Sequence, residues 1–163
     1  PYFFVWLKNW HSCLLKAMQW RIITVGKPAL SWAKAGFEDY LSRLRRMARV
    51  EHVAVKDGPR DLVDARMLTA SDDGLRIILD ERGRALRSLE LAAWTRRQEV
   101  CGTKRACLLI GGAEGHGELL RASADECWTL SKFTLQHEVA LVVLAEQIYR
   151  AYSILRGEPY HRE

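Results

Sequence analysis

The chain has 163 residues, of which 48% are hydrophobic and 28% charged, a balance typical of a soluble globular protein rather than a disordered one. Its length fits one domain with a sizeable core, and its formal charge of +5 favours a polyanionic partner such as nucleic acid. No apolar stretch approaches the roughly 20 residues of a membrane-spanning helix, so we expect no membrane association.

Residues 1–17 precede the first predicted strand and carry an apolar stripe. On a helical wheel, Phe3, Leu7, Trp10 and Leu14 share one face. We predict that this segment is an extension outside the functional domain, which is expected to span residues 18–163. A helix docked on the surface of the protein is the alternative.

Strands and helices are expected to alternate along residues 18–163. Short apolar runs bounded by turn residues predict strands at 20–25, 50–55, 75–79, 106–110 and 128–130. Apolar positions three and four residues apart predict helices at 31–47, 62–69, 88–98, 119–124 and 138–155. A turn is predicted at 80–83. The alternation indicates an α/β fold, with a mostly parallel sheet and helices on both faces.

The last predicted helix, 138–155, is apolar around most of its circumference. Its polar stripe is narrow, with Glu146, Arg150 and Ser153. A helix of this kind has partners on more than one side. In a small protein we expect the second partner to be another subunit, and therefore a homodimer.

The four cysteines do not form a recognisable ligand set. Cys13, Cys101, Cys107 and Cys127 show no C-x-x-C spacing, so no metal site is predicted. Free thiols at irregular spacing fit a reducing compartment, and we expect a cytoplasmic protein.

A glycine-rich loop, 110–117, follows the apolar strand at 106–110. Ligands of α/β proteins bind at the carboxyl ends of central strands, and paired glycines such as Gly111 and Gly112 let the backbone approach a ligand closely. The loop is not a Walker motif, because it lacks the closing Gly-Lys-Ser/Thr. It is not a dinucleotide fingerprint either, because Leu120 stands where the last glycine is required.

A second loop, Leu130-Ser131-Lys132-Phe133-Thr134-Leu135, joins the last predicted strand to the last helix. Its alternating apolar and hydroxyl residues could surround an adenosine. A plain strand-to-helix connection is the alternative, which the composition alone favours.

The C-terminal tail combines a helix stop with reactive side chains. Gly157 is a typical helix-ending residue, and Pro159 cannot continue a helix. The tail then offers Tyr160, His161 and Arg162, which include a proton-transfer group and an anion-binding guanidinium. A polar terminus without a role is the alternative.

Four segments together resemble one family, the SPOUT-class methyltransferases that act on pseudouridine in large-subunit ribosomal RNA. The resemblance lies in residues 108–115 (LLIGGAEG), 128–137 (WTLSKFTLQH), 144–151 (LAEQIYRA) and 159–163 (PYHRE). Weaker similarity at 25–27 and 79–83 extends it over about residues 18–163.

The resemblance implies S-adenosylmethionine as methyl donor, N(3) of a pseudouridine in 23S-type ribosomal RNA as acceptor, a homodimer and a C-terminal trefoil knot. The residues that would hold the cofactor are Leu79, Gly111, Leu130, Ser131, Lys132, Phe133, Thr134 and Leu135. Tyr160, His161 and Arg162 would be the catalytic residues that face the RNA base. Because the tail leaves directly from the helix expected at the dimer interface, we expect the tail of one subunit to complete the cofactor pocket of the other.

Two other functions remain open from the residues themselves. One is an α/β module that binds RNA or the ribosome without catalysis. The other is a nucleotide-dependent enzyme that uses the loop at 111–117 for phosphate.

Overall fold

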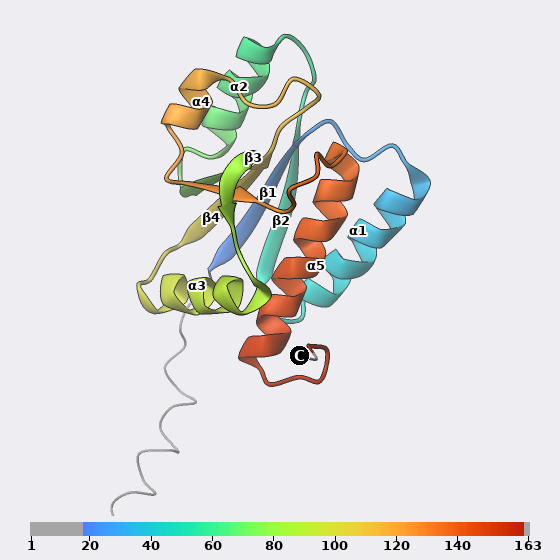
Figure 1. Ribbon diagram of the computed structural model, residues 1–163, viewed down its shortest axis with the longest axis vertical. Coiled ribbons are helices and arrows are strands. Elements are labelled where there is room, and N and C mark those ends of the chain that lie inside the picture. The colour runs from blue at the N-terminus through green and yellow to red at the C-terminus, as the bar shows by residue number, and fades with distance from the viewer. Residues whose placement is uncertain (1–17, 162–163) are drawn as a thin grey trace, which may run out of the picture.

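The computed structural model describes residues 18–161 (Figure 1). Within them, five parallel strands form one sheet in the order β2-β1-β4-β3-β5. The strands are β1 (Gln19–Val25), β2 (Arg49–Val55), β3 (Leu75–Ala85), β4 (Arg105–Ile110) and β5 (Glu126–Thr129). The helices are α1 (Ser31–Leu44), α2 (Arg60–Ala70), α3 (Ser88–Val100), α4 (Glu118–Ala122) and α5 (His137–Leu155). The predicted α/β fold is confirmed, whereas the implied knot stays a prediction.

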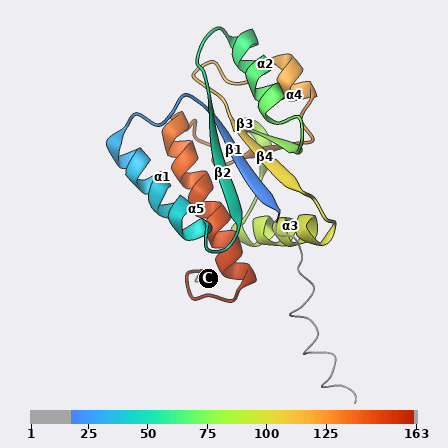
Figure 2. The ribbon, with the colours of Figure 1, turned by 180° about the vertical axis from the view of Figure 1, so that it is seen from behind.

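The helices form two layers, one on each face of the sheet. Figures 1 and 2 show α1, α3 and α5 on one side and the shorter α2 and α4 on the other. Among the described residues, no helix has the length and apolar content needed to cross a membrane. The predictions for residues 1–17 and for Arg162 lie outside the described residues.

Each layer has its own core because neighbouring residues of a strand point to opposite faces. In β4, Leu108 packs toward α1, α3 and α5, while Leu109 packs toward α2 and α4. Both are fully buried, and each such leucine contributes roughly 1.5–3 kcal/mol. The continuous apolar run in β4 is therefore the signature of a central strand covered on both faces.

β3 continues past the predicted turn at 80–83, which is a correction. Leu79 and Arg84 both pair with Trp128 of β5, so the four residues between them bulge out and the strand then resumes. Gly83 makes this possible, because a Cβ there would lie 2.3 Å from the carbonyl carbon of Trp128. The sequence signals of a turn thus belong to a bulge beside the strand ends.

α5 lies between α1 and α3, so both of its flanks are covered within one chain. Toward α1, a Cβ on Gly36 would meet Val142 at 3.5 Å. Toward α3, Ser88 Oγ donates to Gln147 Oε1 at 2.8 Å, and Tyr152 Oη donates to Glu99 Oε1 at 2.8 Å. The apolar circumference of α5 therefore does not by itself require a second subunit, and the homodimer stays a prediction.

We predict that Gly83→Ala destabilises the protein, because its methyl group has no room beside Trp128. The free energy of unfolding should fall by about 2 kcal/mol or more, and the melting temperature by about 4–8 °C. Gly36→Ala is the matched control, since its Cβ meets only ordinary contacts and alanine favours a helix. Equal melting temperatures for the two variants would contradict the close approach of β3 to β5.

Candidate functional site

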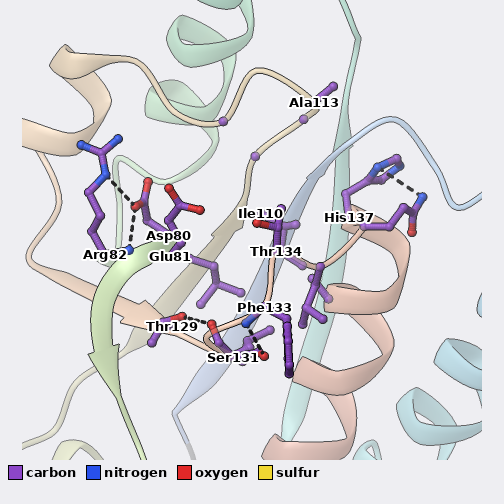
Figure 3. A pocket seen from close by; sticks show the side chains of 18 of the residues that line it. Asp80, Glu81, Arg82, Ile110, Ala113, Thr129, Ser131, Phe133, Thr134 and His137 are labelled. Carbon is purple, nitrogen blue, oxygen red and sulfur yellow. Dashed lines mark hydrogen bonds and ion pairs between the residues drawn. The ribbon is translucent and has the colours of Figure 1, made fainter.

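A cavity of about 590 Å³ opens where β4 and β5 end, beside the bulge of β3 and the first turn of α5 (Figure 3). Four segments and two single residues line it: residues 79–82, 110–115, 129–131, 133–137, Arg121 and Ala140. The parallel strands thus bring three loops, far apart in the sequence, to one edge of the sheet.

The glycine loop forms one wall of the cavity and folds tightly on itself. The Gly115 N–H donates to the Gly112 carbonyl at 3.0 Å, and Gly115 has a φ of 67°. A Cβ on Gly111 would lie 3.1 Å from the Gly115 carbonyl carbon and 3.3 Å from Cε1 of His116. A side chain at position 111 would therefore be in tight contact with the rest of the loop.

The opposite wall is the loop between β5 and α5. Thr129 Oγ1 donates to the Ser131 carbonyl at 2.7 Å, and the Phe133 N–H donates to Ser131 Oγ at 2.9 Å. Gln136 then caps α5, as its Oε1 accepts from the N–H groups of Glu138 and Val139. These bonds hold the loop in a defined shape with its backbone along the cavity.

Asp80 brings a nearly buried carboxylate to the cavity wall, with a side chain only 8% exposed. Arg121 pairs with its Oδ2 at 2.8 Å. The Arg82 N–H donates to its Oδ1 at 3.0 Å (Figure 3). Sequence reasoning missed Asp80 and Arg121 as site residues. An acidic residue directly after a predicted buried strand was the available signal for Asp80.

Two buried polar residues outside the cavity lining, Asp64 and His116, support the glycine loop. Asp64 of α2 accepts from the Gly117 N–H at 2.9 Å. His116 is 4% exposed, and burial lowers its pKa, although the negative charges of Asp64 and Asp80 act to raise it. The imidazole is therefore neutral at pH 7, and its ring fills the space beside Gly111.

Within one chain, the structure places the predicted cofactor residues and the predicted catalytic residues apart; a site shared between two subunits stays a prediction. Seven of the eight predicted cofactor residues line the cavity, and the exception is Lys132, which is exposed. Of the predicted catalytic residues that the structure describes, neither Tyr160 nor His161 lines it. α5 has 19 residues and is therefore roughly 28 Å long. The cavity lies at its first turn and the tail leaves from its last (Figure 1).

A protein-family model described as "Predicted SPOUT methyltransferase" matches residues 18–161. The chain belongs to the SPOUT methyltransferase family. The family resemblance of the sequence motifs is thereby confirmed, and membership favours a methyltransferase over the nucleotide-dependent enzyme and the non-catalytic module.

Curated relatives cover nearly the same region. The chain is 43% identical over 145 residues to a protein of Thermus thermophilus, and the match spans 89% of this chain and 99% of the relative. It is 40% identical over 157 residues to a protein of Thiobacillus denitrificans, spanning 90% of this chain and all of the relative. Both relatives carry the name ribosomal RNA large subunit methyltransferase H.

Solved structures share the fold at low sequence identity. A probable methyltransferase from Bordetella pertussis matches with a TM-score of 0.58 and 14% identity, over 85% of this chain and 96% of that one. A probable methylase family protein from Haemophilus influenzae matches with a TM-score of 0.52 and 10% identity, over 89% and 70% of the two chains. These likenesses support the fold alone.

We predict that His116 makes this SPOUT protein less stable in mild acid. An unfolded histidine takes up a proton as the pH falls through about 6.5, whereas burial keeps folded His116 neutral to lower pH. The unfolded state then binds more protons, so the free energy of unfolding falls from pH 7 to pH 5. His116→Gln should lose less stability over that interval, as measured by urea unfolding at both pH values.

His52 also has a pKa lowered mainly by burial, but it is present in both proteins and cancels in the comparison. An equal loss of stability in wild type and His116→Gln would show that His116 is not held neutral.

Proposed function

We propose that this protein transfers a methyl group from S-adenosylmethionine to N(3) of a pseudouridine in large-subunit ribosomal RNA. The observation that carries the proposal is the cavity at the strand ends, because the motif loops of residues 110–115 and 129–137 build it. The printed name of relatives that match over their whole length supports ribosomal RNA as the substrate. The net charge of +5 suits such a polyanion.

The cavity fits S-adenosylmethionine in size and chemistry. Its volume of about 590 Å³ lies within the usual range for small-ligand sites. Gly111 contributes no side chain to the wall, so a ligand can approach its backbone. Ile110, Leu130 and Leu135 offer apolar surface for a nucleoside. Asp80 is paired with Arg121, whereas the carboxylate of Glu81 suits a ligand that carries positive charge.

When bound, S-adenosylmethionine supplies a methyl group activated by its sulfonium. The residues of the cavity would orient it, and the backbone along 129–135 would hold the adenosine. N(3) of the acceptor has to lose its proton before or during attack. His161 is a candidate base, and Arg162 could stabilise the developing anion.

We further propose a homodimer in which the tail of one subunit completes the cavity of the other. A single α5 separates the cavity from its own tail, whereas an antiparallel pair of α5 helices would bring each tail to the partner's cavity. Apolar residues near the start of α1 and α5 support such a contact. Leu30 is 41% and Trp32 54% exposed, and Val139 and Val143 are half-buried. The Leu30 N–H donates to Glu138 Oε2 at 2.9 Å, so the two helix starts adjoin.

We propose a cytoplasmic location, which a ribosomal RNA substrate would favour. The thiols described, in Cys101, Cys107 and Cys127, are free, which fits a reducing compartment.

The function is tested by transfer of tritium from methyl-labelled S-adenosylmethionine to ribosomes that lack the modification. We expect label at N(3) of one pseudouridine. Gly111→Val should abolish transfer and weaken S-adenosylmethionine binding by tenfold or more in calorimetry (about 1.4 kcal/mol), because its side chain would collide with Gly115. A folded Gly111→Val protein with unchanged affinity would remove the glycine loop from the cofactor site. Cofactor binding by wild type without transfer to any ribosomal RNA would leave a binding protein rather than this enzyme.

The shared site is tested with mixed dimers. A subunit lacking residues 159–163 should bind S-adenosylmethionine but transfer no methyl group. A Gly111→Val subunit should be inactive because it has an intact tail but no longer binds the cofactor. Mixing the two should recover activity, since one subunit supplies an intact cavity and the other an intact tail. Wild-type subunits taken through the same exchange are the control. Verified mixed dimers that stay inactive would show that each subunit uses its own tail.

A further inference from the structure

The described part of the tail is held against its own subunit through Tyr160. The Tyr160 hydroxyl donates to Glu146 Oε1 of α5 at 3.1 Å and lies 3.2 Å from the hydroxyl of Tyr40 on α1. Its ring stands edge to face against Tyr149, with centroids 4.8 Å apart. The guanidinium of Arg150 lies 4.9 Å from the centroid of the same ring. Tyr160 is therefore engaged at its hydroxyl by Glu146 and Tyr40 and at its ring by Tyr149 and Arg150.

The residues around Tyr160 are themselves fixed. Arg150 Nε donates to Glu146 Oε1 at 3.0 Å, and the side chains of Glu146 and Arg150 are only 16% and 26% exposed. The rings of Tyr40 and Tyr149 pack at 6.0 Å between centroids. We call Tyr40, Glu146 and Arg150 the tyrosine socket, with the ring of Tyr149 beside it.

The helix end directs the chain back toward the socket. Gly157 has a φ of 66°, and its N–H donates to the Ile154 carbonyl at 3.0 Å. The Glu158 N–H donates to the Ser153 carbonyl at 2.9 Å. This pair of bonds is a Schellman motif, which reverses the chain after α5. Tyr160 thus returns to residues of α5 that lie five to nine positions before the end of the helix, and its position is set by two independent constraints.

We propose that Tyr160 is a positioning residue: the tyrosine socket fixes the tail at residue 160, and thereby the place of the following residues that are proposed to act on the RNA base. The inference rests on the proposed function and changes one expected role, because the resemblance implies that Tyr160 faces the RNA base as a catalytic residue, whereas the structure packs its ring on its own subunit. It also adds Tyr40, a residue of α1 outside the recognised motifs, to the groups on which methyl transfer depends.

The protonation of Tyr160 fits this role. Burial, followed by the neighbouring Tyr40 and Glu146, raises the pKa of Tyr160 above its usual value. The hydroxyl therefore keeps its proton and can donate it in a hydrogen bond to the Glu146 carboxylate.

A double-mutant cycle on Tyr40 and Tyr160 tests the proposal. Tyr160→Phe keeps the ring but loses both hydroxyl contacts, and Tyr40→Phe removes the α1 partner alone. We expect Tyr40→Phe to lower kcat about fivefold, the size of one lost hydrogen bond, and Tyr160→Phe to lower it at least as much. The double variant should be little worse than Tyr160→Phe alone, because Tyr160→Phe already removes the contact with Tyr40. The affinity for S-adenosylmethionine should not change, since the cavity lies elsewhere.

Tyr149→Phe is the matched control, because Tyr149 contacts Tyr160 through its ring rather than through its hydroxyl. We expect its kcat to stay within about twofold of wild type, well below the effect of a lost hydrogen bond. A ring that stacks on the base gives the opposite pattern: Tyr160→Phe and Tyr40→Phe are then as active as wild type. That pattern overturns the proposal. So does a double variant whose loss of kcat is the product of the losses in the two single variants.

A second measurement does not depend on the enzyme's activity. Carboxypeptidase should release residue 160 from the free protein about fivefold faster in Tyr40→Phe and Glu146→Gln than in wild type or Tyr149→Phe, if one hydrogen bond is lost in each. Equal release rates would show that the socket does not hold the tail. If release is faster in Tyr40→Phe and Glu146→Gln but wild type has no methyltransferase activity, the socket holds the tail and the proposed function is wrong.

Discussion

Strand β4 is the constraint on which the rest of the structure depends. Its apolar residues alternate between two cores, so it can lie only at the centre of the sheet, with helices on both faces. The central position fixes where β4 ends, and Gly111 follows directly. β3 and β5 lie in order beside it, so the bulge after Leu79 and the loop after Thr129 meet the glycine loop at one edge. The cavity is thus a consequence of strand order.

Glycines decide how closely these elements approach one another. Gly83 lets the backbone of β3 run against the carbonyl of Trp128, and Gly111 lets the loop close against Gly115. A methyl group at position 83 would displace the backbone of Trp128, and one at position 111 would press on the backbone of Gly115. Close packing of this kind suits a site where in-line methyl transfer demands a fixed geometry.

Much of the fold could be predicted from the sequence, because periodicity reports which face of an element is buried. The strands, the helices and the helix stop at Gly157 all followed from local patterns. The continuation of β3 did not, since the turn-like residues 80–83 gain their meaning only from Trp128, which is distant in the sequence. The ion pair of Asp80 with Arg121 and the contact of Tyr40 with Tyr160 escaped for the same reason. Long-range contacts leave no local pattern.

Helix α5 links these observations. Its first turn closes the cavity, its flanks pack on α1 and α3, and its outer side holds Tyr160. A rigid helix transmits position, so the tail and the cavity wall are fixed relative to each other even though they lie apart. A dimer that pairs two such helices in opposite directions would therefore bring a positioned tail to a positioned cavity, without a mobile loop. Precision at a shared site would then come from the stiffness of α5 and from the socket near its end.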